Sequence, residues 1–298
     1  MTIIWGTNFP IVKTAFRELD PQAFNAMRMI VASATFLGVL AAVRPAAQRR
    51  LREHPIESTL TSVFYTPARI SSREWLALAG LGVVGHVLYQ FLFIGGLART
   101  TVANSSLLLA LTPVLIALAG AVIGHERVSR LHWMGIGVSL VGIYLVVGTG
   151  FALGTPTLTG DVMMFGAVCC WAGYTLGSRP LMARHSPVAV SGISMALGTV
   201  LYVPLVWPRV RAVDWAAVSG WTIFLLVYSA LFALCVAYTI WYIGVRQIGS
   251  ARTSAYSNFI PMVAMTSAVI FLNEPIGFSK VLGAAAVLTG VALTRSDG

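Results

Sequence analysis

Most of the chain consists of apolar runs that are each about as long as a membrane is thick. An α-helix needs roughly 20 mostly apolar residues to cross the hydrocarbon core, and about 17 to 25 is the usual range. Inside a bilayer such a run must be helical, because a helix satisfies its own backbone hydrogen bonds. The chain is therefore predicted to be an all-α integral membrane protein with ten transmembrane helices. The predicted helices cover residues 2–18, 22–43, 75–97, 101–123, 131–149, 159–178, 187–207, 219–241, 250–272 and 277–294.

The composition agrees with this class and excludes others. Apolar residues make up 57% of the chain and charged residues only 10%, whereas a soluble domain carries about 25% charged residues. The net charge of +10 does not indicate a nucleic-acid partner, because the basic residues lie between apolar runs rather than on one clustered face. The lipid bilayer is the expected partner. The three cysteines, Cys169, Cys170 and Cys235, fall inside apolar runs and are interpreted as packing residues rather than disulfides or metal ligands.

The segment 101–147 recurs 148 positions further along the chain. Its matched residues are prolines, glutamates and glycines, which are costly in apolar helices and are seldom placed there without reason. The matched pairs are Pro113 with Pro261, Glu126 with Glu274, Gly135 with Gly283, and Gly142 with Gly290. A second offset of 166 pairs Trp5 with Trp171, Lys13 with Arg179, and Pro21 with Pro187. We therefore predict two homologous halves, residues 1–150 and 151–298, with five helices each.

With an odd number of helices in each half, the two halves cross the membrane in opposite directions. The chain must enter the second half from the opposite side, so the two five-helix repeats are inverted relative to one another. Inverted repeats are a recurrent architecture of transporters, because two similar halves can open a central site to alternate sides of the membrane. The alternative interpretation is a static bundle or an assembly scaffold.

The distribution of Lys and Arg predicts the orientation. With a cytoplasmic amino terminus, 13 basic residues lie on the inside and 6 on the outside, which is the expected bias. Most of the difference comes from one predicted loop, 44–74. No cleavable signal peptide is expected, because an apolar run begins at Ile3 with no basic region before it. The predicted location is the cell (inner) membrane, multi-pass, with both termini in the cytoplasm.

Polar and aromatic residues recur at matching places in the two halves. A lone Trp or Tyr in a membrane helix is often an interfacial anchor or a packing residue. Recurrence in both halves favours a cavity wall, and large rings with neutral donors suit an amphipathic organic solute better than a bare ion. The residues predicted to line a substrate cavity are Trp5, Asn8, Arg28, Tyr89, Gln90, Asn104, Trp171, Tyr174, Tyr238, Tyr256 and Asn258.

Arg28 is the one basic residue well inside a predicted helix. An unpaired charge in the membrane costs about 2.5 to 3.5 kcal/mol on insertion scales. A structural interpretation is an arginine that satisfies helix ends or carbonyls. The functional interpretation is a cation on the route of an anionic group, such as a substrate carboxylate.

Three further residues lie inside predicted helices and carry hypotheses. Pro113 and Pro261 each remove a backbone hydrogen bond near the centre of a helix, and their pairing favours a role in gating. His86 could titrate near neutrality, although a single histidine is more often only hydrogen-bonded.

The sequence lacks the motifs of several enzyme classes. His125-Glu126 is not followed by the histidine of a zinc site, and neither a GxSxG elbow nor a GK[ST] phosphate loop occurs. We therefore predict no enzyme, no metal and no cofactor. The remaining alternative to transport is a multi-pass membrane protein that acts as an intramembrane enzyme or an assembly partner.

Together these motifs resemble the drug/metabolite transporter (DMT) superfamily, in particular its EamA-type ten-helix permeases. The likeness spans nearly the whole chain, although each motif is short. It is carried by residues 5–9, Asp20-Pro21, Arg28, residues 103–105, residues 111–113, residues 124–127, residues 251–261 and residues 273–275, together with Gly135, Gly137, Gly142, Gly283 and Gly290.

The resemblance implies a secondary transporter that moves small organic solutes, namely amino acids, related metabolites or toxic analogues, most often by export. It also implies a central cavity lined by the helices over 2–18, 75–97, 101–123, 159–178, 219–241 and 250–272. One feature departs from relatives with four helices, which carry an embedded glutamate in the first helix. This chain has none there, which argues against a proton-driven pump for cationic drugs. The resemblance does not distinguish a monomer from a homodimer.

Overall fold

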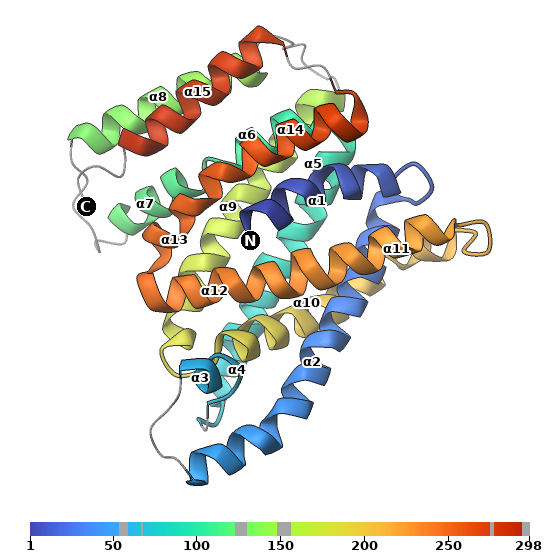
Figure 1. Ribbon diagram of the computed structural model, residues 1–298, viewed down its shortest axis with the longest axis vertical. Coiled ribbons are helices and arrows are strands. Elements are labelled where there is room, and N and C mark those ends of the chain that lie inside the picture. Colours follow the sequence, from blue (N-terminus) through green and yellow to red (C-terminus); the bar gives the residue numbers. More distant parts are fainter. Residues whose placement is uncertain (54–58, 67, 123–129, 148–155, 275–276, 294–298) are drawn as a thin grey trace. The chain divides into compact units, whose positions relative to one another are not determined.

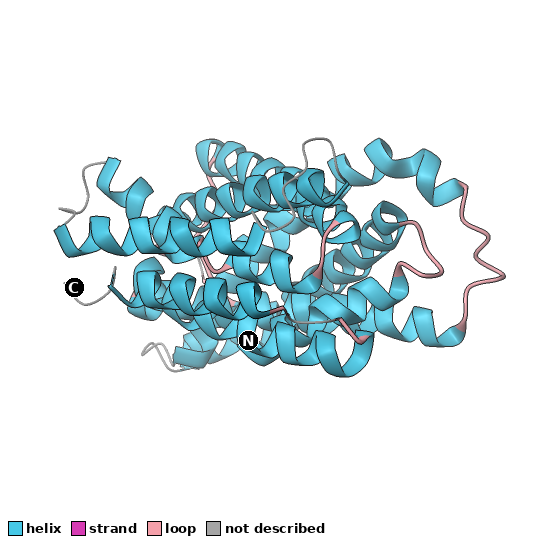
Figure 2. Cartoon of the chain, turned by 90° about the horizontal axis from the view of Figure 1, so that it is seen from above, coloured by secondary structure: helices cyan, strands magenta, loops and turns pink. Residues whose placement is uncertain are grey.

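The computed structural model describes residues 1–298 except 54–58, 67, 123–129, 148–155, 275–276 and 294–298. The described residues form helices and connecting loops, and none of them lies in a strand (Figure 2). They divide into two compact units, each assembled from separate stretches of chain. Unit 1 comprises Met1, residues 18–91 and residues 173–250, and unit 2 comprises residues 2–17, 92–172 and 251–298. Each unit therefore takes residues from both halves of the sequence.

Unit 1 contains helices that pack mainly around α10. This helix contacts α2, α4, η1 and α12, and η3 packs on α2 and on α12. The carboxyl-terminal part of α9 and the first residues of α5 also belong to this unit. Its elements are α2 (Pro21–Glu53), α3 (Thr59–Phe64), α4 (Ser72–Gly82), η1 (Val83–Leu88), α5 (Tyr89–Arg99), α9 (Pro156–Met182), α10 (Pro187–Arg211), α11 (Gly220–Tyr228), η3 (Ser229–Val236) and α12 (Ala237–Ile248).

Unit 2 contains two pairs of closely packed helices, α8 with α15 and α1 with α14, and α6 also packs on α14 (Figure 1). The rest of α5 and of α9 completes this unit. Its other elements are α1 (Thr2–Ala15), α6 (Val102–Leu109), α7 (Thr112–Val122), α8 (Arg130–Val147), α13 (Ser250–Tyr256), η4 (Ser257–Phe259), α14 (Ile260–Leu272) and α15 (Phe278–Leu293).

The helices form where the apolar runs are. Four continuous helical stretches in the described residues are long and apolar enough to cross a membrane by themselves. They are Pro21–Arg49, Ser72–Arg99, Pro187–Arg211 and Gly220–Ile248. Shorter apolar helices lie at Val102–Ile116, Ile260–Leu272 and Val281–Gly290. Several helices begin at a Ser or Thr whose side chain accepts a backbone N–H, as Ser186 does before α10 and Ser219 before α11.

The stretches 72–99 and 220–248 share an irregularity. Each begins as an α-helix, changes to a π-helix and returns to an α-helix. The π-helical segments are η1, which contains His86, and η3, which begins at Ser229. His86 and Ser229 are both fully buried polar residues, and π-helical segments are rare and occur frequently at functional sites.

The stretches 102–122 and 250–272 share a different irregularity. The helix stops after Leu109 and restarts at Thr112, directly before Pro113. The other stretch passes through the 3₁₀ segment η4 and restarts at Ile260, directly before Pro261. A proline lacks the N–H that a continuous helix needs but fits the first turn of a new one, which explains why each helix restarts there.

One prediction is wrong in part. Residues 44–74 were expected to form a loop, but α2 continues through Arg44 to Glu53 and α3 covers Thr59–Phe64. Ala, Gln, Arg, Leu and Glu are strong helix formers and fill the extension of α2, so propensity extends the helix past its apolar part in spite of Pro45.

Candidate functional site

Arg28 lies at the centre of a buried polar cluster in unit 1. Its side chain is 1% exposed. One terminal nitrogen, Nη1, donates to Ser229 Oγ at 3.0 Å, and the other, Nη2, donates to Asn25 Oδ1 at 2.9 Å and to Gln90 Oε1 at 3.0 Å. The amide of Gln90 in turn donates to the hydroxyl of Tyr238 at 3.4 Å. We call these five residues the arginine cluster.

Among the described residues, all the groups that accept hydrogen bonds from Arg28 are neutral. Its Nε has no hydrogen-bond partner among the described residues, and the guanidinium carbon lies 5.8 Å from the ring centre of Phe24. A buried cation is normally paired with a carboxylate, because amide and hydroxyl oxygens compensate only part of the lost hydration. The arginine cluster therefore holds a positive charge that an anionic group would stabilise further.

A second chain of hydrogen bonds in unit 1 begins at the π-helical His86. His86 Nε2 lies 3.0 Å from Tyr174 Oη, which lies 2.8 Å from Ser194 Oγ. The ring of His86 packs edge-on against that of Tyr174, with 4.9 Å between centroids, and lies 5.9 Å from the ring of Tyr238. Gly198 of α10 lets the two helices approach closely at His86, since a Cβ atom on Gly198 would lie 2.4 Å from the Cβ of His86. His86 is thus held by a tight network around its ring.

Unit 2 contains a different group of predicted residues. The rings of Trp5 and Trp171 are perpendicular at 89°, with centroids 5.7 Å apart, and Trp171 is 4% exposed. Asn8 is also buried. The amide of Asn104 donates to both carboxylate oxygens of Asp161, at 3.3 and 3.2 Å.

The other predicted residues of the cavity are less enclosed. Tyr89, in unit 1, is half-buried, whereas Tyr256, in unit 2, is 56% exposed. The side chain of Asn258 lies outside the part of the chain that the structure describes. Pro113 and Pro261 are both buried at the helix restarts. The structure thus groups Arg28, Gln90, Tyr174 and Tyr238 in the interior of unit 1, and Trp5, Asn8, Asn104 and Trp171 in unit 2.

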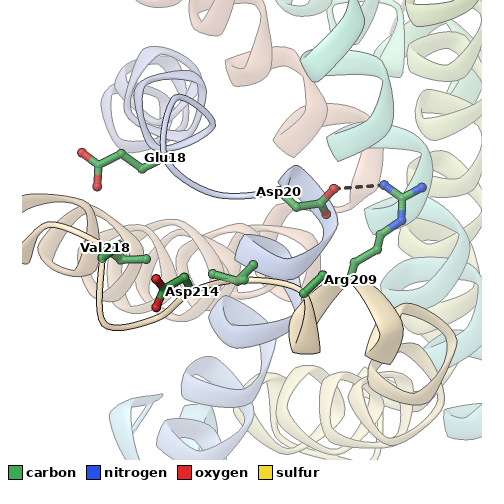
Figure 3. Close-up of a pocket in the computed structure, with 8 residues that line it drawn as sticks. Glu18, Asp20, Arg209, Asp214 and Val218 are labelled. Atoms are coloured by element: carbon green, nitrogen blue, oxygen red, sulfur yellow. Dashed lines mark hydrogen bonds and ion pairs between the residues drawn. The ribbon is translucent and has the colours of Figure 1, made fainter.

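A surface pocket of ≈ 520 Å³ lies in unit 1 between residues 18–20 and residues 209–218 (Figure 3). All three of its carboxylates serve local contacts, and Asp214 accepts the N–H of Ala216 at 3.2 Å. Asp20 accepts a hydrogen bond from Arg209 at 3.1 Å (Figure 3), and Glu18 accepts two from Ser219, one from its N–H and one from its hydroxyl, both at 2.9 Å. The contacts with Ser219 lower the pKa of Glu18 from its usual value. The pocket therefore shows no carboxylate set aside for a ligand.

Several residues of these clusters were not among the predicted site residues. They are Asn25, Ser229 and Ser194 in unit 1 and Thr100 and Asp161 in unit 2, where Thr100 Oγ1 donates to Asp161 at 2.6 Å. The available signal was the presence of small polar side chains in apolar runs, which must find partners at membrane depth. Which partner each one finds depends on residues up to 201 positions away.

The comparison with protein families identifies the chain. A model described as the EamA-like transporter family matches residues 1–148 and 158–296. The chain belongs to the EamA-like transporter family. The resemblance seen in the sequence is thereby confirmed, as is the prediction of an all-α multi-pass membrane protein.

Relatives of this EamA-like protein carry names of the same kind. An uncharacterized transporter of Archaeoglobus fulgidus is 26% identical over 99% of this chain and 94% of its own. The uncharacterized transporter YyaM of Bacillus subtilis is 25% identical, over 99% and 90%. A probable terminal-alkyne amino-acid exporter of Streptantibioticus cattleyicolor is 25% identical, over 98% and 89%. One solved crystal structure shares the fold, with a TM-score of 0.65 and 19% identity over 99% of this chain and 93% of the other.

These comparisons support a membrane transporter and do not favour the alternative of an intramembrane enzyme or an assembly partner. The expected partners, a small-molecule solute and the lipid bilayer, agree with this family. Within the described residues, no group of three or more His, Cys, Asp or Glu side chains could hold a metal ion.

Proposed function

We propose that this EamA-like protein is a secondary transporter that moves small organic solutes by alternating access. The solutes we propose are amino acids, related metabolites or toxic analogues, and the direction is export. The printed name of the relative from Streptantibioticus cattleyicolor, a probable amino-acid exporter, supports this substrate class. The internal repeat supports the mechanism, because inverted halves of 1–150 and 151–298 can exchange conformations.

The observation that carries the proposal is the buried guanidinium of Arg28 with only neutral acceptors. The carboxylate of an amino acid is the kind of group that would complete its coordination. A charge-assisted hydrogen bond of this type is worth about 1.5 to 3 kcal/mol. Arg28 is therefore proposed to contact the anionic group of the solute, and the hydroxyl of Tyr238, linked to it through Gln90, is proposed to orient it.

The remaining predicted residues have a supporting role in this proposal. Large aromatic surfaces contact the apolar part of an amphipathic solute, while amide groups fix its orientation. The proposed contacts are Trp5, Asn8, Tyr89, Gln90, Asn104, Trp171, Tyr174, Tyr256 and Asn258. Pro113 and Pro261, at the helix restarts, are proposed to act in gating. We propose the cell (inner) membrane as the location, with both termini in the cytoplasm.

The test is a counterflow experiment with purified protein in liposomes. Labelled amino acids are offered outside, with the unlabelled compound inside, for the wild type and for two matched tryptophan variants. Trp171 is 4% exposed, whereas Trp221 on α11 is 62% exposed. We expect saturable exchange that is lost in Trp171→Ala and retained in Trp221→Ala. No exchange of any amino acid by folded wild-type protein would contradict the proposed substrate class, and equal exchange by both variants would contradict the role of Trp171.

A further inference from the structure

A salt bridge in unit 2 joins residues that are far apart in the sequence. Lys13 is in the last turn of α1, and Glu274 follows the carboxyl-terminal end of α14. The Nζ atom of Lys13 lies 3.2 Å from Glu274 Oε1 and donates a second hydrogen bond to the carbonyl oxygen of Thr100 at 2.6 Å. Both carboxylate oxygens of Glu274 accept from the N–H of Val102, at 3.2 and 3.1 Å. One lysine and one carboxylate thus hold three chain segments together.

The carboxylate of Glu274 occupies a favourable electrostatic position. Val102 is the first residue of α6, and the amino-terminal end of a helix presents free N–H groups and a partial positive charge. Glu274 is therefore stabilised by the helix end as well as by Lys13. The side chains of Lys13 and Glu274 remain 27% and 16% exposed, so water can replace their contacts at moderate cost, unlike the contacts of a fully buried pair.

The two helices that meet at this salt bridge, α6 and α14, belong to the stretches 102–122 and 250–272, which are each interrupted before a proline. The segment α6 runs from Val102 to the interruption before Pro113, and α14 runs from the restart at Pro261 to Asn273. Asn273 has a positive φ of 54° and ends α14 sharply, which directs the next residue back toward α6. Each segment therefore has a charged contact at one end and a break in the helix at the other.

Between the salt bridge and the interruptions, small and flexible apolar side chains pack between α6 and α14. Ala103 and Leu107 of α6 form a buried cluster with Met265 of α14. Apolar contacts of this kind are not directional and permit sliding or separation more readily than interlocked polar networks do. Release of the charged contact would let the ends of α6 and α14 move while the interruptions act as hinges.

We propose that Lys13, Glu274 and the amino-terminal end of α6 form a latch that opens and closes during the transport cycle, an inference that rests on the proposed function. The latch is closed in this structure. Lys13 and Glu274 are positioning residues, since they hold α6 and α14 without contacting the solute. Both belong to the matched positions of the internal repeat, where Lys13 pairs with Arg179 and Glu274 with Glu126.

The test measures how fast a cysteine behind the latch reacts with a water-soluble maleimide. Cys169, Cys170 and Cys235 are first replaced by alanine, and Met265→Cys, at a position that is 9% exposed, supplies the probe. We expect Lys13→Gln and Glu274→Gln each to accelerate labelling about two- to fivefold, which corresponds to the loss of a partly exposed ion pair. The double variant should label no faster than the faster single variant, because the two residues act as one unit.

Two controls separate the latch from a general loosening of the fold. Lys13→Arg keeps the charge and should label at the rate of the parent protein. Arg209→Gln breaks an exposed ion pair of unit 1, Arg209 to Asp20 at 3.1 Å, and should leave labelling unchanged. In the parent, raising the salt concentration from about 0.05 to 0.5 M should accelerate labelling, because salt screens the exposed pair, and it should have no such effect in Lys13→Gln.

Unchanged labelling in both single variants, independent effects that multiply in the double variant, or a salt response that persists in Lys13→Gln would each overturn the latch. Should one variant fail to fold in size-exclusion chromatography, the other single variant decides the question. Labelling requires no solute, so its failure is distinct from failure of the proposed function, which a lack of counterflow in the wild-type protein would show.

Discussion

The two units of this EamA-like protein treat a positive charge in opposite ways. In unit 1, Arg28 is 1% exposed and donates only to neutral side chains. In unit 2, Lys13 is 27% exposed and is paired with the carboxylate of Glu274. Arg28 is shielded from water and has no carboxylate partner among the described residues. Lys13 has a carboxylate partner, and water can reach this pair and replace the contact. A buried charge without a counterion is therefore suited to ligand binding, whereas a partly exposed, paired charge is suited to a contact that forms and breaks.

The largest expected effect is that of Arg28→Met, which removes the buried charge while keeping much of the apolar volume. If Arg28 binds the carboxylate of the solute, counterflow should fall about 10- to 100-fold, which corresponds to the loss of a charge-assisted hydrogen bond. Thermal unfolding of the purified protein is measured alongside. A marked drop in the unfolding temperature with unchanged transport would show that Arg28 is structural.

The next effect concerns the close approach of α10 to His86 in unit 1. A Cβ atom at Gly198 would lie 2.4 Å from His86 Cβ and 2.7 Å from the carbonyl oxygen of Gly82. Gly198→Ala should therefore destabilise the fold by about 1 to 3 kcal/mol, the usual cost of overpacking. Gly38→Ala in α2 is the control, because nothing lies within 4 Å of its Cβ position. Equal unfolding temperatures for the two variants would show that α10 can move away from His86 and Gly82 to accommodate the added methyl group at little cost.

A smaller effect is expected from Tyr174→Phe. This change removes the hydroxyl between His86 and Ser194 and keeps the ring contacts with His86 and Tyr242. Loss of the shared hydroxyl should cost about 1 to 2 kcal/mol in the free energy of unfolding. The change is measured as the shift of the unfolding temperature relative to the wild type, and Tyr202→Phe, which removes a buried hydroxyl that donates to Gln22 in the same unit, should give a shift of similar size. A gain in stability in Tyr174→Phe would mean that the hydroxyl is not hydrogen-bonded in solution.

The smallest effect tests Glu18, which like Glu274 accepts a hydrogen bond at the amino-terminal end of a helix but has no lysine partner among the described residues. Glu18 accepts the N–H and the hydroxyl of Ser219, the residue before α11, and these contacts lower its pKa below the usual 4.5. A lowered carboxyl pKa adds stability above pH 4.5, and this stability is lost as the pH falls through the lowered pKa. Glu18→Gln should slightly reduce the unfolding temperature at pH 7 and weaken its decline below about pH 4.5. An unchanged decline would assign the pH dependence to other groups.

The helices could be predicted from the sequence, because apolar runs of membrane length have few alternatives to a helix. The predicted run 187–207 lies within α10 (Pro187–Arg211), and the run 277–294 corresponds to α15 (Phe278–Leu293). The extension of α2 to Glu53 was missed because its residues are polar and the prediction followed hydropathy. The π-helical segments were missed because the insertion of one residue leaves no mark in an apolar run.

The sequence indicated which polar residues lie in the interior but not which side chains they contact. Arg28, Gln90 and Tyr238 could be selected because polar groups inside a membrane are costly unless they find hydrogen-bond partners. Their connection through Asn25 and Ser229 could not be derived, because spacing along one helix says nothing about the register of a neighbouring helix. The contact of Lys13 with Glu274 spans 261 positions and depends on the left-handed turn at Asn273. That the predicted residues bind a solute stays a prediction.

Competition in the counterflow assay tests whether Arg28 binds the anionic group of the solute. Labelled amino acid exchanges in liposomes that contain the wild type or Arg28→Met, while either the unlabelled amino acid or its uncharged carboxamide is added as competitor. We expect that in the wild type the amino acid competes at least ten times more strongly than the carboxamide, and that any residual exchange in Arg28→Met has lost this preference. Equal competition by both compounds in the wild type, or an undiminished preference in Arg28→Met, would contradict the assignment of Arg28 to the anionic group of the solute.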